Sequence, residues 1–214
     1  MNTTTAKFLL SAPDLASCPD DTMPEFAFAG RSNVGKSSLL NLLVGKRDLA
    51  NVSATPGHTK QINFFTINDS WRLVDLPGYG YAHVERKERS RFNESVAEYL
   101  RDRENLALVF ALVDASLPPQ PIDLEFIEGL IDYEVPFVLV FTKTDRVSPD
   151  KLREHMDALR TKLAEWCKTP PEIYTCSAIN RQGRHAILSL IESILTPEQR
   201  QRPLPKPPRR NTPW

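Results

Sequence analysis

The chain has 214 residues, 41% of them hydrophobic, which suits one α/β domain with its own core. Lys plus Arg and Asp plus Glu total 27 each, so no overall charge draws the molecule to nucleic acid or anionic lipid. The cysteines Cys18, Cys167 and Cys176 are widely spaced, which argues against a disulfide framework or a zinc site. No apolar run is long enough to span a bilayer, so we expect a cytoplasmic protein with no membrane partner.

Short apolar runs rich in β-branched or aromatic residues predict six strands. These runs are Glu25 to Ala29, Ile62 to Ile67, Trp71 to Leu76, Leu106 to Asp114, Pro136 to Thr142 and Glu172 to Cys176. Helical periodicity predicts five helices between and after them. They are Lys36 to Val44, Ser90 to Arg101, Pro121 to Asp132, a helix opening at Ser148 that reaches Trp166, and Gln182 to Leu195.

Alternation of strands and helices predicts a mostly parallel sheet with helices on both faces and ligands beyond the carboxyl ends of the strands. The pair Ile62 to Leu76 is the exception. Asn68, Asp69 and Ser70 are too few for a crossover, so they must form a hairpin. One strand should therefore run antiparallel.

The two ends and one internal segment lack regular patterns. We expect residues 1–22 to be loose, 23–195 to form the domain, and 196–214, rich in proline and basic residues, to be disordered. The polar loop Lys46 to Lys60 is long for a compact domain, which is typical of a functional or mobile segment.

A phosphate-binding pattern follows the first predicted strand and opens the first predicted helix. It comprises Gly30, Arg31, Ser32, Asn33, Val34, Gly35, Lys36 and Ser37, and matches Gly-x4-Gly-Lys-Ser. Its glycines let backbone N–H groups point at phosphates beside a helix N-terminus. Lys36 then supplies a charge near the β and γ phosphates, and the Ser37 hydroxyl can coordinate Mg2+.

A second phosphate element ends the strand that begins at Trp71. It consists of Asp75, Leu76, Pro77 and Gly78. Its position predicts that the Asp75 carboxylate holds the hydration shell of Mg2+ and that the Gly78 N–H meets the γ-phosphate.

The base-binding element comes later, at the carboxyl ends of the last two predicted strands. Its first part is Thr142, Lys143, Thr144 and Asp145, and its second part is Thr175, Cys176, Ser177 and Ala178. Asp145 can accept two hydrogen bonds from guanine, a donor pair that adenine lacks. Lys143 can lay its stem along the base. The second part could present backbone N–H groups to the guanine O6.

The long loop and the residues that follow it are the candidate switch segment. The binding residues expected there are Gly57, His58, Thr59, Lys60 and Gln61. A threonine hydroxyl in such a loop can reach Mg2+ when the γ-phosphate orders the segment. Thr55 and Thr59 are both candidates on this argument.

Together these motifs resemble the TrmE-Era-EngA-EngB-Septin-like GTPases, and specifically the EngB (YsxC/YihA) family of ribosome-biogenesis GTP-binding proteins, over roughly residues 22 to 195. The resemblance implies a three-layer P-loop GTPase domain with Lys36, Thr59 and Gly78 in catalysis. It also implies Thr59 as a Mg2+ ligand beside Ser37 and Asp75, the latter through water. A role in large ribosomal subunit assembly, contact with its RNA, and an association with cell division and septation are implied only by this resemblance.

Two residues depart from the general GTPase pattern. Thr142 stands where many GTPases have an asparagine that braces the phosphate loop, which favours moderate nucleotide affinity. Tyr79 stands where many have the glutamine that orients water, which favours slow hydrolysis unless a partner or K+ supplies the missing group. We expect a monomer.

Two other functions compete with a GTP-hydrolysing switch. A small-molecule P-loop kinase would leave Thr142 to Asp145 without a role. A nucleotide-insensitive RNA-binding module acting through the basic tail would leave the phosphate loop unexplained. The four histidines have no metal-ligand spacing and are expected at the surface or in loops.

Overall fold

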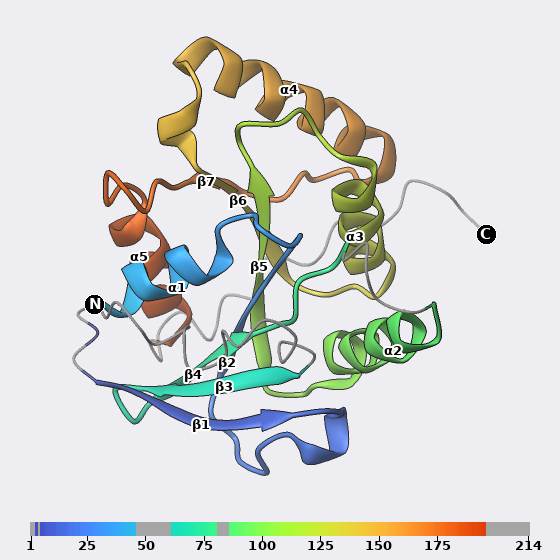
Figure 1. Ribbon diagram of the computed structural model, residues 1–214, viewed down its shortest axis with the longest axis vertical. Helices are drawn as coiled ribbons and strands as arrows, with labels where there is room; N and C mark the ends of the chain where they lie inside the picture. The colour runs from blue at the N-terminus through green and yellow to red at the C-terminus, as the bar shows by residue number, and fades with distance from the viewer. Residues whose placement is uncertain (1–2, 4, 46–60, 81–85, 196–214) are drawn as a thin grey trace.

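The computed structural model describes residues 3, 5–45, 61–80 and 86–195; the side chains of 86–93 lie outside the described part. Its centre is one seven-stranded sheet (Figure 1). The strands are β1 (Ala6–Ala12), β2 (Glu25–Gly30), β3 (Ile62–Ile67), β4 (Trp71–Asp75), β5 (Leu106–Asp114), β6 (Phe137–Thr142) and β7 (Ile173–Thr175). The helices in the described residues are α1 (Lys36–Val44), α2 (Arg86–Asp102), α3 (Pro121–Asp132), α4 (Pro149–Trp166) and α5 (Arg184–Leu195).

The strand order is β1-β3-β4-β2-β5-β6-β7. The five strands from β4 to β7 in that order run parallel to one another, whereas β3 is antiparallel to both β4 and β1. The predicted hairpin joins β3 and β4: Asn68 and Asp69 have positive φ values of 51° and 50°, as a tight hairpin turn requires. The predicted fold class, with its single antiparallel strand, is confirmed.

The prediction that residues 1–22 are loose was wrong for β1. This strand pairs with β3 along its length, so the sheet has seven strands in the described residues rather than six. Its sequence AKFLLSA does not alternate, and the register shifts between Phe8 and Leu10. Because pairing with a strand fifty or more residues away stabilises this edge strand, its local pattern did not reveal it.

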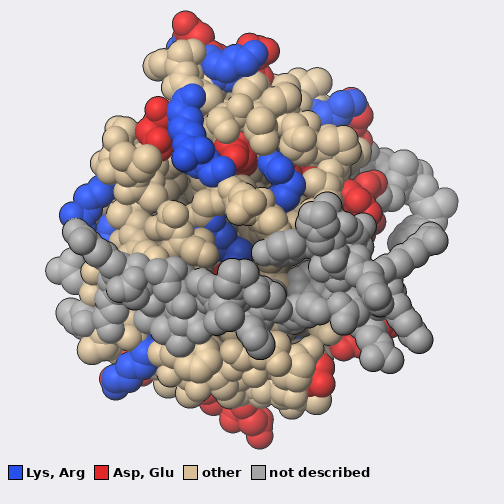
Figure 2. Space-filling view, viewed as in Figure 1, with Lys and Arg blue, Asp and Glu red and all other residues tan. Residues whose placement is uncertain are grey.

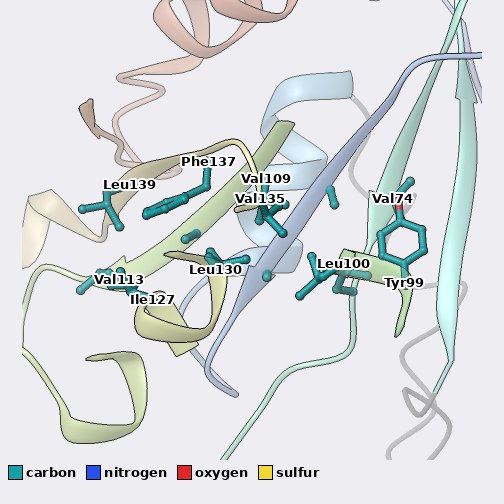
Figure 3. Packing of buried hydrophobic residues seen from close by; sticks show 14 of the residues in the cluster. Val74, Tyr99, Leu100, Val109, Val113, Ile127, Leu130, Val135, Phe137 and Leu139 are labelled. Atoms are coloured by element: carbon teal, nitrogen blue, oxygen red, sulfur yellow. The ribbon is translucent and has the colours of Figure 1, made fainter. Parts of the chain in front are cut away.

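Helices cover both faces of the sheet (Figure 1). One face packs against α1 and α5, with Leu39, Leu43 and Ile187 buried among strand residues. The other packs against α2, α3 and α4; Figure 3 shows Tyr99, Leu130 and Phe137 in this second cluster. Burial on both faces explains why β2, β5 and β6 are almost continuously hydrophobic.

The outer face of α4 carries both signs of charge. Four i,i+3 ion pairs line it, among them Lys151 with Glu154 and Arg160 with Asp157. Figure 2 shows acidic and basic side chains side by side at the top of the view, over α4. These pairs are exposed, so they favour solvation more than stability.

Candidate nucleotide-binding site

The parallel strands bring the sequence-predicted motifs to one edge of the sheet. The register aligns Phe28 with Asp75, Gly30 with Leu112, and Asp114 with Thr142. The carboxyl ends of β2, β4, β5 and β6 therefore lie together, with β7 beside β6. A ligand at this edge would meet all the phosphate and base motifs at once.

The segment Gly30 to Ser37 forms the loop between β2 and α1. Asn33 and Gly35 adopt left-handed φ values of 66° and 102°, which turn the backbone around the helix start. Gly35 is the N-cap of α1, and Lys36 and Ser37 are the first two residues of the helix. Because glycine has no side chain, no side-chain oxygen caps the free N–H groups of the first turn. This arrangement leaves N-terminal N–H groups of α1 for an anionic ligand.

Lys36 and Asp75 form an ion pair across the phosphate side of the site. Both side chains are largely buried, with exposed fractions of 10% and 2%. The cation beside Asp75 is thus the Lys36 ammonium. Ser37, which is exposed, follows Lys36 in α1. A carboxylate and a hydroxyl suit Mg2+, which takes few protein ligands and otherwise keeps waters and phosphate oxygens. The described residues contain no cluster of three or more His, Cys, Asp or Glu suited to a metal.

Gly78 lies directly against the phosphate loop. A Cβ on Gly78 would come within 3.2 Å of Ser32 Oγ and 3.3 Å of Ser32 N, closer than an ordinary contact. The carbonyl of the next residue, Tyr79, accepts a hydrogen bond from Ser32 N–H at 3.0 Å. The structure thus brings Gly30 to Ser37 and Asp75 to Gly78 together, as the sequence predicted.

Thr142 braces the phosphate loop despite replacing the usual asparagine. Its hydroxyl is 2.5 Å from Val34 O and 3.2 Å from Val113 O, and it is the donor to these carbonyls. A hydroxyl has one proton, so it satisfies one carbonyl at a time. The buried bond to Val34 keeps the link between the base motif and the phosphate loop.

Lys143 makes a second link between the same two motifs. Its Nζ donates to Asn33 O and to Asp114 Oδ2, both at 2.6 Å. Burial would raise the pKa of Asp114, but hydrogen bonds from Lys143 and Ser116 hold it below its usual value. Asp114 was not predicted as a site residue; its place at the end of β5 is the signal that could have identified it.

The Asp145 carboxylate is oriented by Ser177. The buried Ser177 Oγ donates to Asp145 Oδ1 at 2.6 Å and accepts from Asn180 N at 3.0 Å. Thr144 Oγ1 donates to Cys176 O at 3.2 Å, which ties the same two loops together. One oxygen of Asp145 is thus held in place, and Asp145 also lines the pocket described below.

The backbone N–H groups of Thr175 to Ala178 differ in their partners. Cys176 N donates to Phe141 O at 2.7 Å and Ser177 N donates to Gln182 O at 3.3 Å. Ala178 is the member of this segment that lines the pocket with Cys176. The contact with guanine O6 stays a prediction, and Ala178 is the residue of this segment that the pocket lining favours for it.

A pocket joins the base motifs to the start of α1. Its lining includes four residues absent from the sequence prediction, Ser38, Leu39, Arg146 and Ile179. The predicted residues that line it are Gly35, Thr142, Lys143, Asp145, Cys176 and Ala178. Burial raises the pKa of the Cys176 thiol to about 11, so this group is neutral and acts as an apolar wall.

Some predicted residues are not assembled here. Gly57, His58, Thr59 and Lys60 lie outside the described residues, and Gln61 is exposed immediately before β3. The expectation that every histidine lies at the surface or in a loop was wrong for His155. It is buried in α4, where Nδ1 is 2.9 Å from the carbonyl oxygen of the buried Ala115, the residue that follows β5.

Comparison with known proteins agrees with this geometry. A family described as MMR_HSR1, 50S ribosome-binding GTPase, matches residues 25–143. A probable GTP-binding protein EngB from Bacteroides fragilis is 47% identical over 195 residues, covering 91% of this chain and 96% of that protein. The probable GTP-binding protein EngB of Porphyromonas gingivalis is 44% identical over 189 residues, covering 88% and 94%.

Solved structures share the fold. The crystal structure of a probable GTP-binding protein engB matches with a TM-score of 0.66 at 23% identity, covering 83% of this chain and all of that one. A single-residue variant of Era from Aquifex aeolicus, bound to GDP.AlF4-, matches with a TM-score of 0.59 at 22% identity, covering 82% of this chain and 56% of that one. Among the described residues, no helix has the length and apolar character needed to cross a membrane.

The fold and the conjunction of phosphate and base motifs at one sheet edge define a P-loop GTPase. Identity above 40% to several curated relatives over nine-tenths of the chain places it more narrowly. The chain belongs to the EngB family of GTP-binding proteins.

Proposed function

We propose that this GTPase is a Mg2+-dependent molecular switch that acts in assembly of the large ribosomal subunit. The observation that carries the nucleotide part is the convergence of Gly30 to Ser37, Asp75 to Gly78 and Thr142 to Asp145 at one edge of the sheet. Hydrogen bonds from Thr142 and Lys143 into the phosphate loop support one continuous GTP and GDP site.

Ser37 and Asp75, the latter through water, would hold Mg2+ with Thr59. The ion would neutralise the charge that develops on the β and γ phosphates. We expect Thr59→Ala to weaken Mg2+-dependent binding of a GTP analogue more than binding of GDP, because only GTP orders that loop. Equal losses for both nucleotides, measured by titration calorimetry, would favour Thr55 or a structural role.

Hydrolysis by the isolated chain should be slow. Lys36 and the Gly78 N–H are the groups that would stabilise the transferred phosphoryl, with Thr59 acting through the metal. The residue after Gly78 is Tyr79, whose phenol replaces the glutamine amide found there in many GTPases. The attacking water therefore lacks an orienting group. A partner or K+ could supply that group.

The ribosomal part of the proposal is supported by the family description, 50S ribosome-binding GTPase. The γ-phosphate would order the segments near Lys46 to Lys60 and after Pro77, and hydrolysis would release them. The basic residues of 196–214 would add contacts to ribosomal RNA. The EngB resemblance extends the role to cell division and septation, with the chain acting as a cytoplasmic monomer.

Cosedimentation with ribosomal subunits tests this role. The full chain should pellet with the large subunit or its precursor in the presence of a GTP analogue, and much less with GDP or without nucleotide. Lys36→Ala is the matched control, because its pelleting should not depend on nucleotide. Equal pelleting in all three states would favour the nucleotide-insensitive RNA-binding module. The kinase is tested separately by comparing GTP and ATP binding, where a preference for ATP would favour it.

A further inference from the structure

Four side chains join the phosphate loop and the residue after Gly78 to helix α3. They are Arg31 from the loop, Tyr79, and Asp123 and Phe126 from α3, and we call them the Tyr79 cluster. None of these side chains belongs to the pocket for the base. Next to the cluster, Ile122 of α3 and Arg31 both lie against Gly80, the residue that follows Tyr79.

Tyr79 is fixed to α3 by two contacts. Its hydroxyl donates to Asp123 Oδ1 at 3.1 Å, and its ring stacks on Phe126 with centroids 4.7 Å apart and an interplanar angle of 26°. Burial and the neighbouring Asp123 raise the pKa of Tyr79 well above its ordinary value. The phenol therefore remains protonated and keeps its role as a donor.

The main chain of Tyr79 is fixed to the phosphate loop. Arg31 and Tyr79 form an isolated parallel bridge, and Tyr79 O accepts from Ser32 N at 3.0 Å and from Ser32 Oγ at 3.3 Å. Tyr79 is thus held on its backbone side by the loop and on its side-chain side by α3. Gly78, one residue earlier, lies against the same Ser32, since an added Cβ would be 3.2 Å from Ser32 Oγ.

Arg31 closes the cluster from the loop side. Its Nε is 3.8 Å from Asp123 Oδ1, and Asp123 is only 2% exposed. Within the described part of the chain, this buried Nε has no hydrogen-bond partner. The Asp123 carboxylate therefore has two partners, the Tyr79 phenol and the Arg31 guanidinium. The guanidinium supplies the opposite charge that a buried carboxylate needs.

We propose that the Tyr79 cluster is a positioning device that sets how much more tightly the chain binds GTP than GDP. The inference rests on the proposed function, because it takes the Gly78 N–H as a ligand of the γ-phosphate. The cluster holds Gly78 against the phosphate loop before any nucleotide binds. Since GDP has no γ-phosphate, loosening Gly78 should weaken GTP binding and leave GDP binding nearly unchanged.

The test compares two conservative variants of the full chain with a matched control. Tyr79→Phe keeps the stacked ring and removes the hydrogen bond, and Asp123→Asn keeps an acceptor oxygen and removes the charge. Tyr99→Phe is the control, because the buried Tyr99 hydroxyl also donates to a carboxylate, Glu25 Oε2 at 2.8 Å, at the opposite ends of the strands. Calorimetry with GDP and a non-hydrolysable GTP analogue in Mg2+ measures the wild type, the two single variants, their double variant and the control, and thermal unfolding confirms that each is folded.

Tyr79→Phe should lower analogue affinity by roughly threefold to tenfold, the usual effect of one hydrogen bond, with GDP affinity changed by less than about twofold. Asp123→Asn should act in the same direction. The double variant should lose less than the product of the two single losses, because both act through one contact. Tyr99→Phe should leave the ratio of the two affinities unchanged.

Three results would overturn the inference: an unchanged ratio in Tyr79→Phe, equal loss of both nucleotides, or the same shift in Tyr99→Phe. Failure of the proposed function looks different. If Lys36→Ala binds GDP and the analogue as well as wild type does, the phosphate site itself is misplaced. If Lys36→Ala loses both while Tyr79→Phe keeps the wild-type ratio, the site stands and only the cluster's role falls.

Discussion

The two halves of the nucleotide site are held together in different ways. On the base side, Thr142, Lys143 and Asp145 each make a hydrogen bond to another loop of the site, at 2.5 to 2.6 Å. On the phosphate side, the fixed cation Lys36 is paired with Asp75, a residue proposed to serve the metal. The proposed base-binding side chains are thus held by neighbouring loops of the site, whereas the proposed phosphate-binding cation is held by a carboxylate.

This difference bears on what each half contributes to binding. A preformed base pocket costs little reorganisation, so it should contribute equally to GTP and GDP affinity. On the proposed function, binding of phosphates and Mg2+ would require the Lys36 ammonium to leave Asp75 and meet the phosphates. Discrimination between GTP and GDP should therefore arise on the phosphate side, next to Gly78.

The strongest challenge to this contrast is loss of the phosphate-side cation. Lys36→Ala should lower affinity for GTP and GDP by more than about a hundredfold, because it removes the charge facing the β and γ phosphates and leaves buried Asp75 unpaired. Lys151→Ala is the control, since that lysine is exposed and pairs with Glu154 on α4. Calorimetric titration checks both, and wild-type affinity in Lys36→Ala would refute the assignment of the loop.

A change of base preference tests the other half. Asp145→Asn should exchange guanine for xanthine preference by at least about a hundredfold, because xanthine has a carbonyl where guanine has its amino group. The structure sharpens this expectation: the amide oxygen can still accept from Ser177, which directs the new N–H group at the base. Competition between GTP and XTP measures the change. Continued preference for GTP would mean that Asp145 does not contact the base.

Much of this fold was predictable because its signals are local. The bounds of α1, α3, α4, β3 and β5 agree with the predicted runs, since each has a buried face or continuous core pattern and clear ends. β1 was missed because its stability comes from pairing with β3, not from its own pattern. The strand order likewise depends on contacts between distant segments.

The site was predictable to the extent that its chemistry is carried by contiguous motifs. Lys36 and Asp145 were predicted as site residues because each belongs to a recognisable motif that follows a strand. Asp114 and Asp123 were missed because each acts through a residue distant in sequence, Lys143 and Tyr79 respectively. No spacing rule connects such partners, so only the folded chain reveals them.

Ser177 tests whether the base side contributes equally to GTP and GDP affinity. Ser177→Ala should weaken binding of both nucleotides by between about threefold and about tenfold, because Asp145 loses the hydroxyl that orients it. Ser189→Ala, which removes an exposed hydroxyl from α5, is the control. A loss confined to the GTP analogue would contradict the separation of the two halves.

The smallest expected effect concerns the chemical step, which depends on neither the Tyr79 phenol nor the base side. The Tyr79 hydroxyl donates to Asp123, its ring lies on Phe126, and its raised pKa keeps it protonated near neutral pH. It cannot accept a proton from water in that state.

Tyr79→Ala should therefore change the single-turnover rate of GTP hydrolysis at saturating GTP by less than about tenfold, or about 1.4 kcal/mol in barrier. Looser positioning of Gly78 would still appear in the concentration of GTP needed for saturation, which should rise. A rate loss above about a hundredfold would make Tyr79 a catalytic residue, and hydrolysis would then depend on α3 as directly as on the phosphate loop.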